Sequence, residues 1–225
     1  MRPQIMLRAA GAVVAPAVLT VAALLAATAP PARSSGVHAA NAGARPAAGD
    51  VSIARRRLNV ISGRHALVSG RVAGTAAGQA VALERRGRGG RWQQVDRART
   101  AAGGAFRLGF HPHAAGSAMV RVRSGAARAR VGRLNVFRHA TVSWYGPGLY
   151  GGHLGCGGTL TPGTLGVASK ALPCGTKVTL RHRGRTVRVP VVDRGPYSAG
   201  REFDLTAATK DRLGFSGVGP VLIAD

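Results

Sequence analysis

Short apolar runs separated by glycine are the feature that most limits how this chain can fold. The 225 residues include 33 Gly and 12 Pro, and only 4% of them are aromatic. Glycine and proline at this density mark turns and interrupt helices, whereas short runs with apolar side chains at alternate positions form strands with one buried face. A strict Gly-X-Y repeat, which would indicate collagen, does not occur. We therefore expect an all-β protein.

The N-terminus has the pattern of an export signal. Arg2 and Arg8 precede an uncharged, Ala-rich stretch at residues 9–29, whose last three residues, Ala-Thr-Ala, fit the small-x-small pattern of a cleavage site. The same stretch is long enough to span a bilayer. Residues 1–29 are therefore either a cleaved signal peptide or an uncleaved anchor, and we expect contact with a membrane only in the second case.

Both alternatives predict that the remaining chain is exported, either secreted or held in the cell envelope. Little nucleic acid is available there, so we do not expect nucleic acid as a partner despite the net charge of +24. Residues 30–50 consist mainly of Ala, Pro, Gly and Ser without an apolar period, a composition typical of a disordered linker.

Residues 51–138 have the pattern of a small β-sandwich. Alternating apolar runs recur between glycine turns at the spacing of an antiparallel sandwich. We interpret this module as immunoglobulin-like in architecture, although it lacks the Cys…Trp…Cys pattern of true immunoglobulin domains. The predicted strands are Ala66–Val72, Ala80–Arg86, Trp92–Thr100, Ala105–Phe110, Ala118–Arg123 and Arg128–Val136.

The same module is strongly basic, with 18 Arg and no Lys against Glu84 and Asp96, a net charge of +16. The arginines could simply solvate the outer faces of the sheets. Alternatively, they could bind an anionic wall polymer such as teichoic acid, anionic lipid or the carboxylates of wall peptides, because the guanidinium fork pairs with phosphate and carboxylate. No residue of the module looks catalytic. His111 and His113 lack a third ligand, so no metal site is predicted.

Residues 139–225 predict a second β-rich domain with one short helix. Asp204 has the position of a helix N-cap before residues 205–213, and Gly214 follows where a C-terminal glycine is expected. The predicted strands are Ala140–Tyr145, Gly166–Ala168, Lys177–His182, Thr186–Val192 and Val218–Ala224.

Four segments of this domain carry a family resemblance: ATVSWYGPGLYGG, LPCGTKV, VPVVDRGPYSAGREFDLTAAT and LGFSGVG. In this order they resemble the rare lipoprotein A-like (RlpA-like) family, whose fold is a double-psi β-barrel. More distantly, the domain is similar to the first domain of expansins. The resemblance implies a bacterial cell-envelope protein that acts on peptidoglycan glycan strands. We expect no cofactor.

The resemblance also implies endolytic lytic transglycosylase activity, which cleaves the glycan strand and leaves a 1,6-anhydro end. The alternative is a non-catalytic, expansin-like module that binds or loosens peptidoglycan or another polysaccharide. Adhesion to polyanions through residues 51–138 alone is a third hypothesis.

Glycan cleavage requires a carboxylic acid that protonates the leaving oxygen. Asp193 ends a predicted strand at a turn, where sites are commonly built, and it matches the aspartate that the family resemblance implicates in catalysis. Its structural alternative is a turn aspartate that bonds its own backbone. Arg194 beside it would favour the ionised carboxylate unless its guanidinium points away. Asp204 matches an acidic residue that expansins require, and it could also serve only as the helix cap.

Two departures from the family weaken the case for catalysis more than the case for binding. Ser169 stands where many members have a histidine, and Leu154 stands where many have a threonine. Serine cannot titrate near neutral pH as histidine does. His153 could take over one of these roles. We expect His153, Ser169 and Arg194 to contribute to substrate binding.

Aromatic and basic side chains near these residues are predicted to bind sugar. Trp144, Tyr145, Tyr150 and Tyr197 lie in or beside Gly-rich loops, and their rings could either stack on sugars or pack in the core. Arg201 could bind a lactyl or peptide carboxylate, or could simply be solvated.

Cys156 and Cys174 are the only cysteines of the chain. In an exported protein such a pair predicts a disulfide. A catalytic cysteine would need a neighbouring group that stabilises the thiolate, and the adjacent sequence supplies none.

Overall fold

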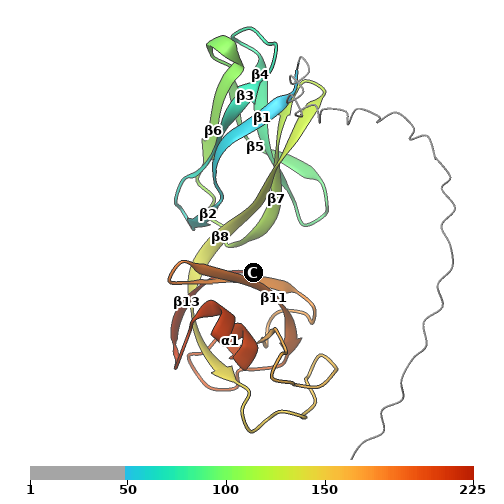
Figure 1. Ribbon diagram of the computed structural model, residues 1–225, viewed down its shortest axis with the longest axis vertical. Helices are drawn as coiled ribbons and strands as arrows, with labels where there is room; N and C mark the ends of the chain where they lie inside the picture. Colours follow the sequence, from blue (N-terminus) through green and yellow to red (C-terminus); the bar gives the residue numbers. More distant parts are fainter. Residues whose placement is uncertain (1–48) are drawn as a thin grey trace, which may run out of the picture. The chain divides into compact units, whose positions relative to one another are not determined.

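The computed structural model describes residues 49–225 (Figure 1). The predictions for the signal peptide or anchor, and nearly all of the predicted linker, lie outside this range. Within it, no helix is both long and apolar enough to cross a membrane. The described residues form thirteen strands, one α-helix and one short 3₁₀ turn, Ala102–Gly104, so the all-β expectation is confirmed.

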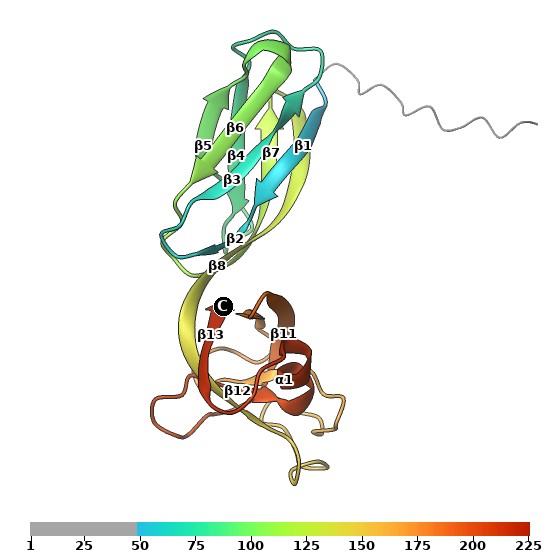
Figure 2. The same cartoon turned by 60° about the vertical axis from the view of Figure 1, so that its left-hand side comes forward.

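The N-terminal strands form two sheets that share one core (Figure 2). The first sheet contains β1 (Val51–Arg57), β3 (Ala66–Val72) and β6 (Ala105–Phe110). The core combines side chains of this sheet, such as Val68, with side chains of the other, such as Leu83. Two sheets with a common core are consistent with a sandwich, and the immunoglobulin-like architecture stays a prediction. The strands of the second sheet in this region are β2 (Asn59–Ile61), β4 (Ala80–Arg86), β5 (Trp92–Arg99), β7 (Gly116–Ser124) and the first part of β8 (Ala127–Tyr145).

Strand β8 joins what the sequence predicted as two strands. It is 19 residues long, pairs with β7 and β2 over its first part, and pairs with β13 and β12 over its second part. The predicted domain boundary at residues 138 and 139 falls within this strand, and the division into domains stays a prediction.

Six strands of the C-terminal region close into a barrel. The hydrogen-bonded order is β12-β9-β11-β10-β13-β8, and β12 also pairs with β8, so the sheet returns to its first strand. Val142, Leu180 and Leu205 are among the buried side chains that fill the interior. Closure removes the free edges that an open sheet would expose. The strands not yet given bounds are β9 (Val167–Ala168), β10 (Lys177–His182), β11 (Arg185–Asp193), β12 (Phe203–Thr206) and β13 (Gly219–Ala224).

The prediction that Asp204 caps the helix is wrong. Helix α1 spans Ala207–Leu213, and its N-cap is Thr206, whose side-chain oxygen accepts from the N–H of Thr209. Asp204 lies instead within β12, where both neighbouring strands fix its backbone. Sheet pairing over a short segment has overridden the local capping pattern. The C-terminal end of the helix is as predicted, because Gly214 adopts the left-handed conformation there.

Candidate active site

Asp193 and Asp204 lie on either side of the short strand β9. Asp193 of β11 is paired with Ala168, and Asp204 of β12 is paired with the same Ala168. Ser143 of β8 is paired with Asp204 in turn. Directly paired residues project from the same face of a sheet, and neighbouring strands are about 4.8 Å apart. The two aspartates therefore share one face with their backbones about 10 Å apart.

A β-bulge turns Asp193 toward this face. Val191 pairs with Val167, yet Asp193 pairs with Ala168, so two residues of β11 span one step of β9. Val191 and Val167 both belong to the barrel core. In a regular strand Asp193 would share the inward face of Val191, two residues before it. The extra residue, Val192, reverses the alternation, as bulges next to active sites often do.

The carboxylate of Asp193 is held by backbone donors. Its Oδ1 accepts the N–H of Gly155 at 2.7 Å and the N–H of Arg194 at 2.8 Å. Both bonds end on Oδ1, so neither uses Oδ2. Gly155 has to be glycine, because a Cβ at this position would lie 3.0 Å from Asp193 Oδ1 and 2.9 Å from Arg194 Cγ.

The guanidinium of Arg194 points away from Asp193. Its Nη1 donates to the carbonyl oxygens of Ser169, at 2.9 Å, and Leu172, at 2.7 Å, and its Nη2 contacts the sulfur of Cys174. Asp193 forms no ion pair within residues 49–225. The guanidinium of Arg194 is therefore not paired with the Asp193 carboxylate.

The predicted disulfide between Cys156 and Cys174 is confirmed, with 5.6 Å between the two Cα atoms. Cys156 follows Gly155, which donates to Asp193, and Cys174 is held by Arg194. The disulfide thus joins the two loop segments that surround the Asp193 carboxylate.

Asp204 and Tyr145 complete the cluster. The hydroxyl of Ser143 donates to Asp204 Oδ1. Tyr145 is two residues after Ser143 in β8 and lies on the same face of that strand. Its hydroxyl is buried and lacks a hydrogen-bond partner of regular geometry within residues 49–225. Burial, with the nearby negative charges of Asp193 and Asp204, raises the pKa of Tyr145, so this hydroxyl stays protonated.

The comparisons with known proteins bear on this region of the chain. The family described as "Lytic transglycolase" matches residues 139–223. A Synechocystis protein named "Probable endolytic peptidoglycan transglycosylase RlpA" is 36% identical over 135 residues, which cover 58% of this chain and 40% of that protein. The "Endolytic peptidoglycan transglycosylase RlpA" of Campylobacter jejuni is 42% identical over 83 residues, which cover 35% of this chain and 30% of that protein.

Residues 139–223 belong to the RlpA-like double-psi β-barrel family. The chain spans 40% or less of the length of these two relatives. Among solved structures, the "Streptomyces papain inhibitor (SPI)" is 22% identical with a TM-score of 0.32, and the match covers 39% of this chain and 92% of that one.

Two of the predicted sugar-binding residues of this RlpA-like barrel have structural surroundings. Trp144 packs against the barrel core, and the ammonium of Lys210 lies 4.3 Å from the centre of its ring. Ser169 is 2% exposed, and its hydroxyl accepts the N–H of Leu172. These placements favour the core-packing alternative for Trp144 and give Ser169 a turn-stabilising hydrogen bond, and substrate contact by either residue stays a prediction.

Three other predicted sugar-binding residues are exposed, and Arg201 is half-buried. Tyr197 is 80% exposed and Tyr150 is 40% exposed. His153 is exposed in a loop, where it forms a β-bridge with Thr159. Arg201 donates to the hydroxyl of Ser198.

Sequence reasoning missed Ser143 and Gly155. The outward position of Ser143 in the strand predicted at residues 140–145 was a usable signal. Nothing in the sequence distinguishes Gly155 from the other glycines of its loop.

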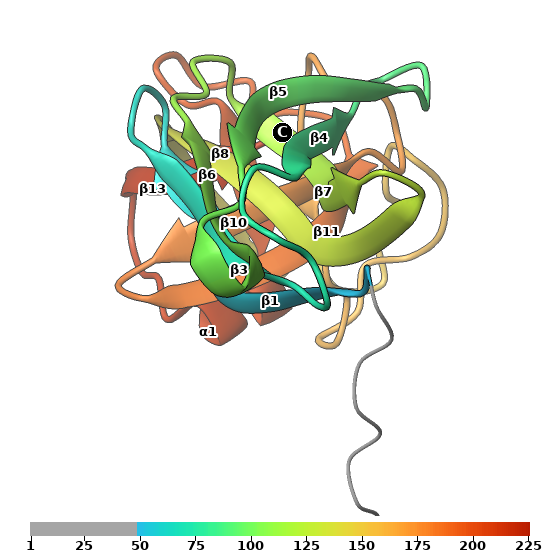
Figure 3. The same cartoon turned by 90° about the horizontal axis from the view of Figure 1, so that it is seen from above.

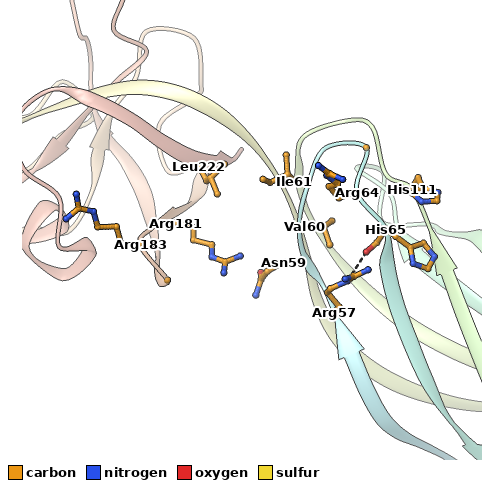
Figure 4. Close-up of a pocket in the computed structure, with 12 residues that line it drawn as sticks. Arg57, Asn59, Val60, Ile61, Arg64, His65, His111, Arg181, Arg183 and Leu222 are labelled. Atoms are coloured by element: carbon orange, nitrogen blue, oxygen red, sulfur yellow. Dashed lines mark hydrogen bonds between the residues drawn. The ribbon is translucent and has the colours of Figure 1, made fainter.

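A separate pocket of about 690 Å³ does not contain these carboxylates (Figure 4). Four arginines and two histidines are among its lining residues, and none of the lining residues is Asp or Glu. It therefore cannot supply the acid that glycan cleavage needs. The basic lining residues are Arg57, Arg64, His65, His111, Arg181 and Arg183.

Proposed function

We propose that this protein cleaves the glycan strands of peptidoglycan as an endolytic lytic transglycosylase, with Asp193 as the catalytic acid and base. The observation that carries the proposal is the pair of aspartates on one barrel face, both without a cationic partner within residues 49–225. The family assignment of residues 139–223 and the names of the relatives support it.

The proposed reaction requires only one acid–base group. The carboxylic acid of Asp193 gives its proton to the glycosidic oxygen as the bond from C1 to that oxygen breaks. The C6 hydroxyl of the same sugar then attacks C1 and gives its proton to the Asp193 carboxylate. The products are a shortened strand with a free hydroxyl and a strand that ends in a 1,6-anhydro ring. No water is consumed, and Asp193 regains its proton.

The neighbouring groups have supporting roles in this proposal. The carboxylate of Asp204 lies on the face where positive charge develops at C1, and it would stabilise that charge. Ser143 holds this carboxylate by its hydrogen bond. Because Tyr145 stays protonated, its hydroxyl can donate to a carboxylate or to a sugar oxygen. The exposed rings of Tyr150 and Tyr197 would provide stacking surfaces for sugars. Action on peptidoglycan places the protein in the cell envelope or outside the cell.

The decisive experiment is incubation of purified peptidoglycan sacculi with the full chain, followed by analysis of the released fragments. The wild type should release fragments with 1,6-anhydro ends, and Asp193→Asn should abolish this release. Asp211→Asn is a matched control, because Asp211 is 69% exposed on α1 and pairs only with the adjacent Lys210. If the wild type binds sacculi but releases no anhydro fragments, the protein is instead a non-catalytic binding module.

A further inference from the structure

The outer face of the second N-terminal sheet gathers arginine side chains. β5, β4, β7 and β8 follow one another across this sheet (Figure 3). Val120 and Val122 of β7 are buried in the core, so the alternating residues Arg121 and Arg123 point outward. The residues that pair with these two arginines on the neighbouring strands lie on the same outward face. Six outward arginines form what we call the arginine face: Arg97, Arg99, Arg121, Arg123, Arg128 and Arg130.

Several of these arginines face each other directly. In the pairing of β7 with β8, Arg121 is opposite Arg130, and Arg123 is opposite Arg128. Like charges at directly opposite positions destabilise a sheet. A surface needed only for solubility would be more stable with mixed charges at these positions. The pairing therefore favours binding over simple solvation, the two alternatives that the sequence left open.

Glu84 offsets only one of the six charges. It lies in β4, where its Oε2 accepts Nε of Arg121 and its Oε1 accepts Nε of Arg123, each at 2.7 Å. Both ion pairs use the Nε atoms, so the terminal Nη atoms remain for a ligand. The guanidinium of Arg121 also lies 4.1 Å from the ring centre of Trp92, which further fixes its position.

The other four arginines have no carboxylate partner among residues 49–225. Arg99 and Arg128 donate only to backbone carbonyl oxygens, those of Gly78 and Ala126. All four side chains are exposed. The face therefore has an excess of accessible positive charge.

We propose that the arginine face binds a linear, water-soluble polymer with repeated phosphodiester charges. Its side chains are about 4.8 Å apart between β7 and β8, about 10 Å apart between β7 and β5, and about 7 Å apart along each strand. An extended polymer can follow such a grid and form several bidentate guanidinium–phosphate contacts, whereas a small anion can reach only one or two of them.

A membrane fits this face less well than a soluble polymer. Surface-bound proteins usually insert apolar side chains below the lipid headgroups. The large exposed hydrophobic side chains within residues 49–225 all lie off the arginine face, at Ile61, Leu149, Tyr150, Tyr197 and Val218. Trp92, the aromatic residue at this face, is covered by Arg121, so the face also lacks the stacking surface typical of single-stranded nucleic acid binding.

Binding of synthetic poly(glycerol phosphate) to the full chain at physiological salt tests this proposal. The triple variant Arg97→Gln, Arg128→Gln and Arg130→Gln should bind at least tenfold more weakly than the wild type. Its dependence on salt should also be shallower, because fewer phosphates are neutralised. Neither Glu84 nor the core is touched by these substitutions, so the thermal unfolding midpoint should change little.

The matched control removes the same charge from the other sheet. Arg55, Arg71 and Arg107 are exposed, and they lie on the outer face of the sheet formed by β1, β3 and β6. Their triple substitution by Gln should weaken binding by less than threefold. Equal losses in both variants would overturn the proposal in favour of non-specific attraction to a basic protein.

Two further probes test the kind of partner. Anionic lipid vesicles and single-stranded DNA, each at matched phosphate concentration, should bind more weakly than poly(glycerol phosphate). Tighter binding of either probe, lost in the Arg97, Arg128 and Arg130 variant, would overturn the choice of partner. The sacculus assay on Asp193→Asn is independent of these results, because no catalytic residue belongs to the arginine face.

Discussion

Glu84 of the N-terminal region and the two paired aspartates of the barrel are held in opposite ways. In the N-terminal region, Glu84 is 7% exposed and receives two guanidinium hydrogen bonds. In the barrel, Asp193 is held by backbone N–H groups and Asp204 by a hydroxyl, and neither forms an ion pair within residues 49–225. This contrast occurs in a chain with 32 Lys and Arg against 8 Asp and Glu.

The contrast separates an acid that is held by cations from two acids that are held by neutral donors. With such an excess of cations, an aspartate remains unpaired only if its surroundings keep cations away. Arg194 is adjacent to Asp193 in sequence, yet its guanidinium is bound to the carbonyl oxygens of Ser169 and Leu172. Glu84 is bound by two guanidinium groups, whereas Asp193 and Asp204 have the unpaired carboxylates that the proposed reaction uses.

The largest expected effect concerns the covalent support of the Asp193 loops. Replacing Cys156 and Cys174 together by serine should lower the free energy of unfolding by about 3 kcal/mol, because the unfolded chain regains the freedom of the closed loop. Urea denaturation measures this loss. Release of anhydro fragments should fall as well, since Gly155 and Arg194 both adjoin the disulfide. Unchanged stability would show that hydrogen bonds alone hold these loops.

The second prediction concerns Gly155, whose backbone N–H holds the Asp193 carboxylate. Gly155→Ala should reduce fragment release by about 100-fold, because its Cβ would displace the carboxylate, and small displacements of catalytic groups are costly. Gly163→Ala is the control, since a Cβ there meets no atom within 4 Å. Equal activity of the two variants would mean that Asp193 does not need the position seen here.

The positions of the strands were largely accessible from sequence, because alternating apolar residues between glycines are a local signal. β3, β4, β6 and β10 have the predicted bounds. β1 was missed because its second half is a run of arginines. β12 was missed because its four residues coincide with a capping pattern.

The arrangement of the candidate site was less accessible. Asp193 was singled out from sequence by its place at a strand end and by the family resemblance. Its pairing through Ala168 with Asp204 depends on a two-residue strand and on a bulge, and both arise from contacts between distant segments. No local pattern encodes such contacts.

The third prediction concerns Glu84, the acid that is held by two arginines. Glu84→Gln should lower the free energy of unfolding by about 1–2 kcal/mol at neutral pH, a value reduced by the partial exposure of both arginines. It should leave fragment release unchanged. Burial alone would raise the pKa of Glu84, but hydrogen bonds from Arg123 and Arg121 lower this pKa below its ordinary value of 4.5.

This direction fixes the pH dependence of the Glu84 contribution. A lowered pKa gives stability that is fully present above pH 4.5 and is lost as the pH falls through the folded-state pKa. The difference between wild type and Glu84→Gln should therefore be constant from neutral pH down to about pH 5 and shrink at lower pH. A difference that grows on acidification would contradict the ion pairs.

The smallest expected effect separates the two roles that the sequence offered for Asp204. Thr206→Ala should destabilise the protein by about 1 kcal/mol, because Thr206 caps α1. Asp204→Asn should cost less stability, since Asn can still accept the hydrogen bond of Ser143, but it should lower fragment release if its charge assists cleavage. Urea denaturation and the sacculus assay on both variants measure the two effects. The opposite result, with Asp204→Asn unstable and fully active, would place Asp204 with Glu84 among the stabilising acids and leave Asp193 as the single reactive carboxylate of the barrel.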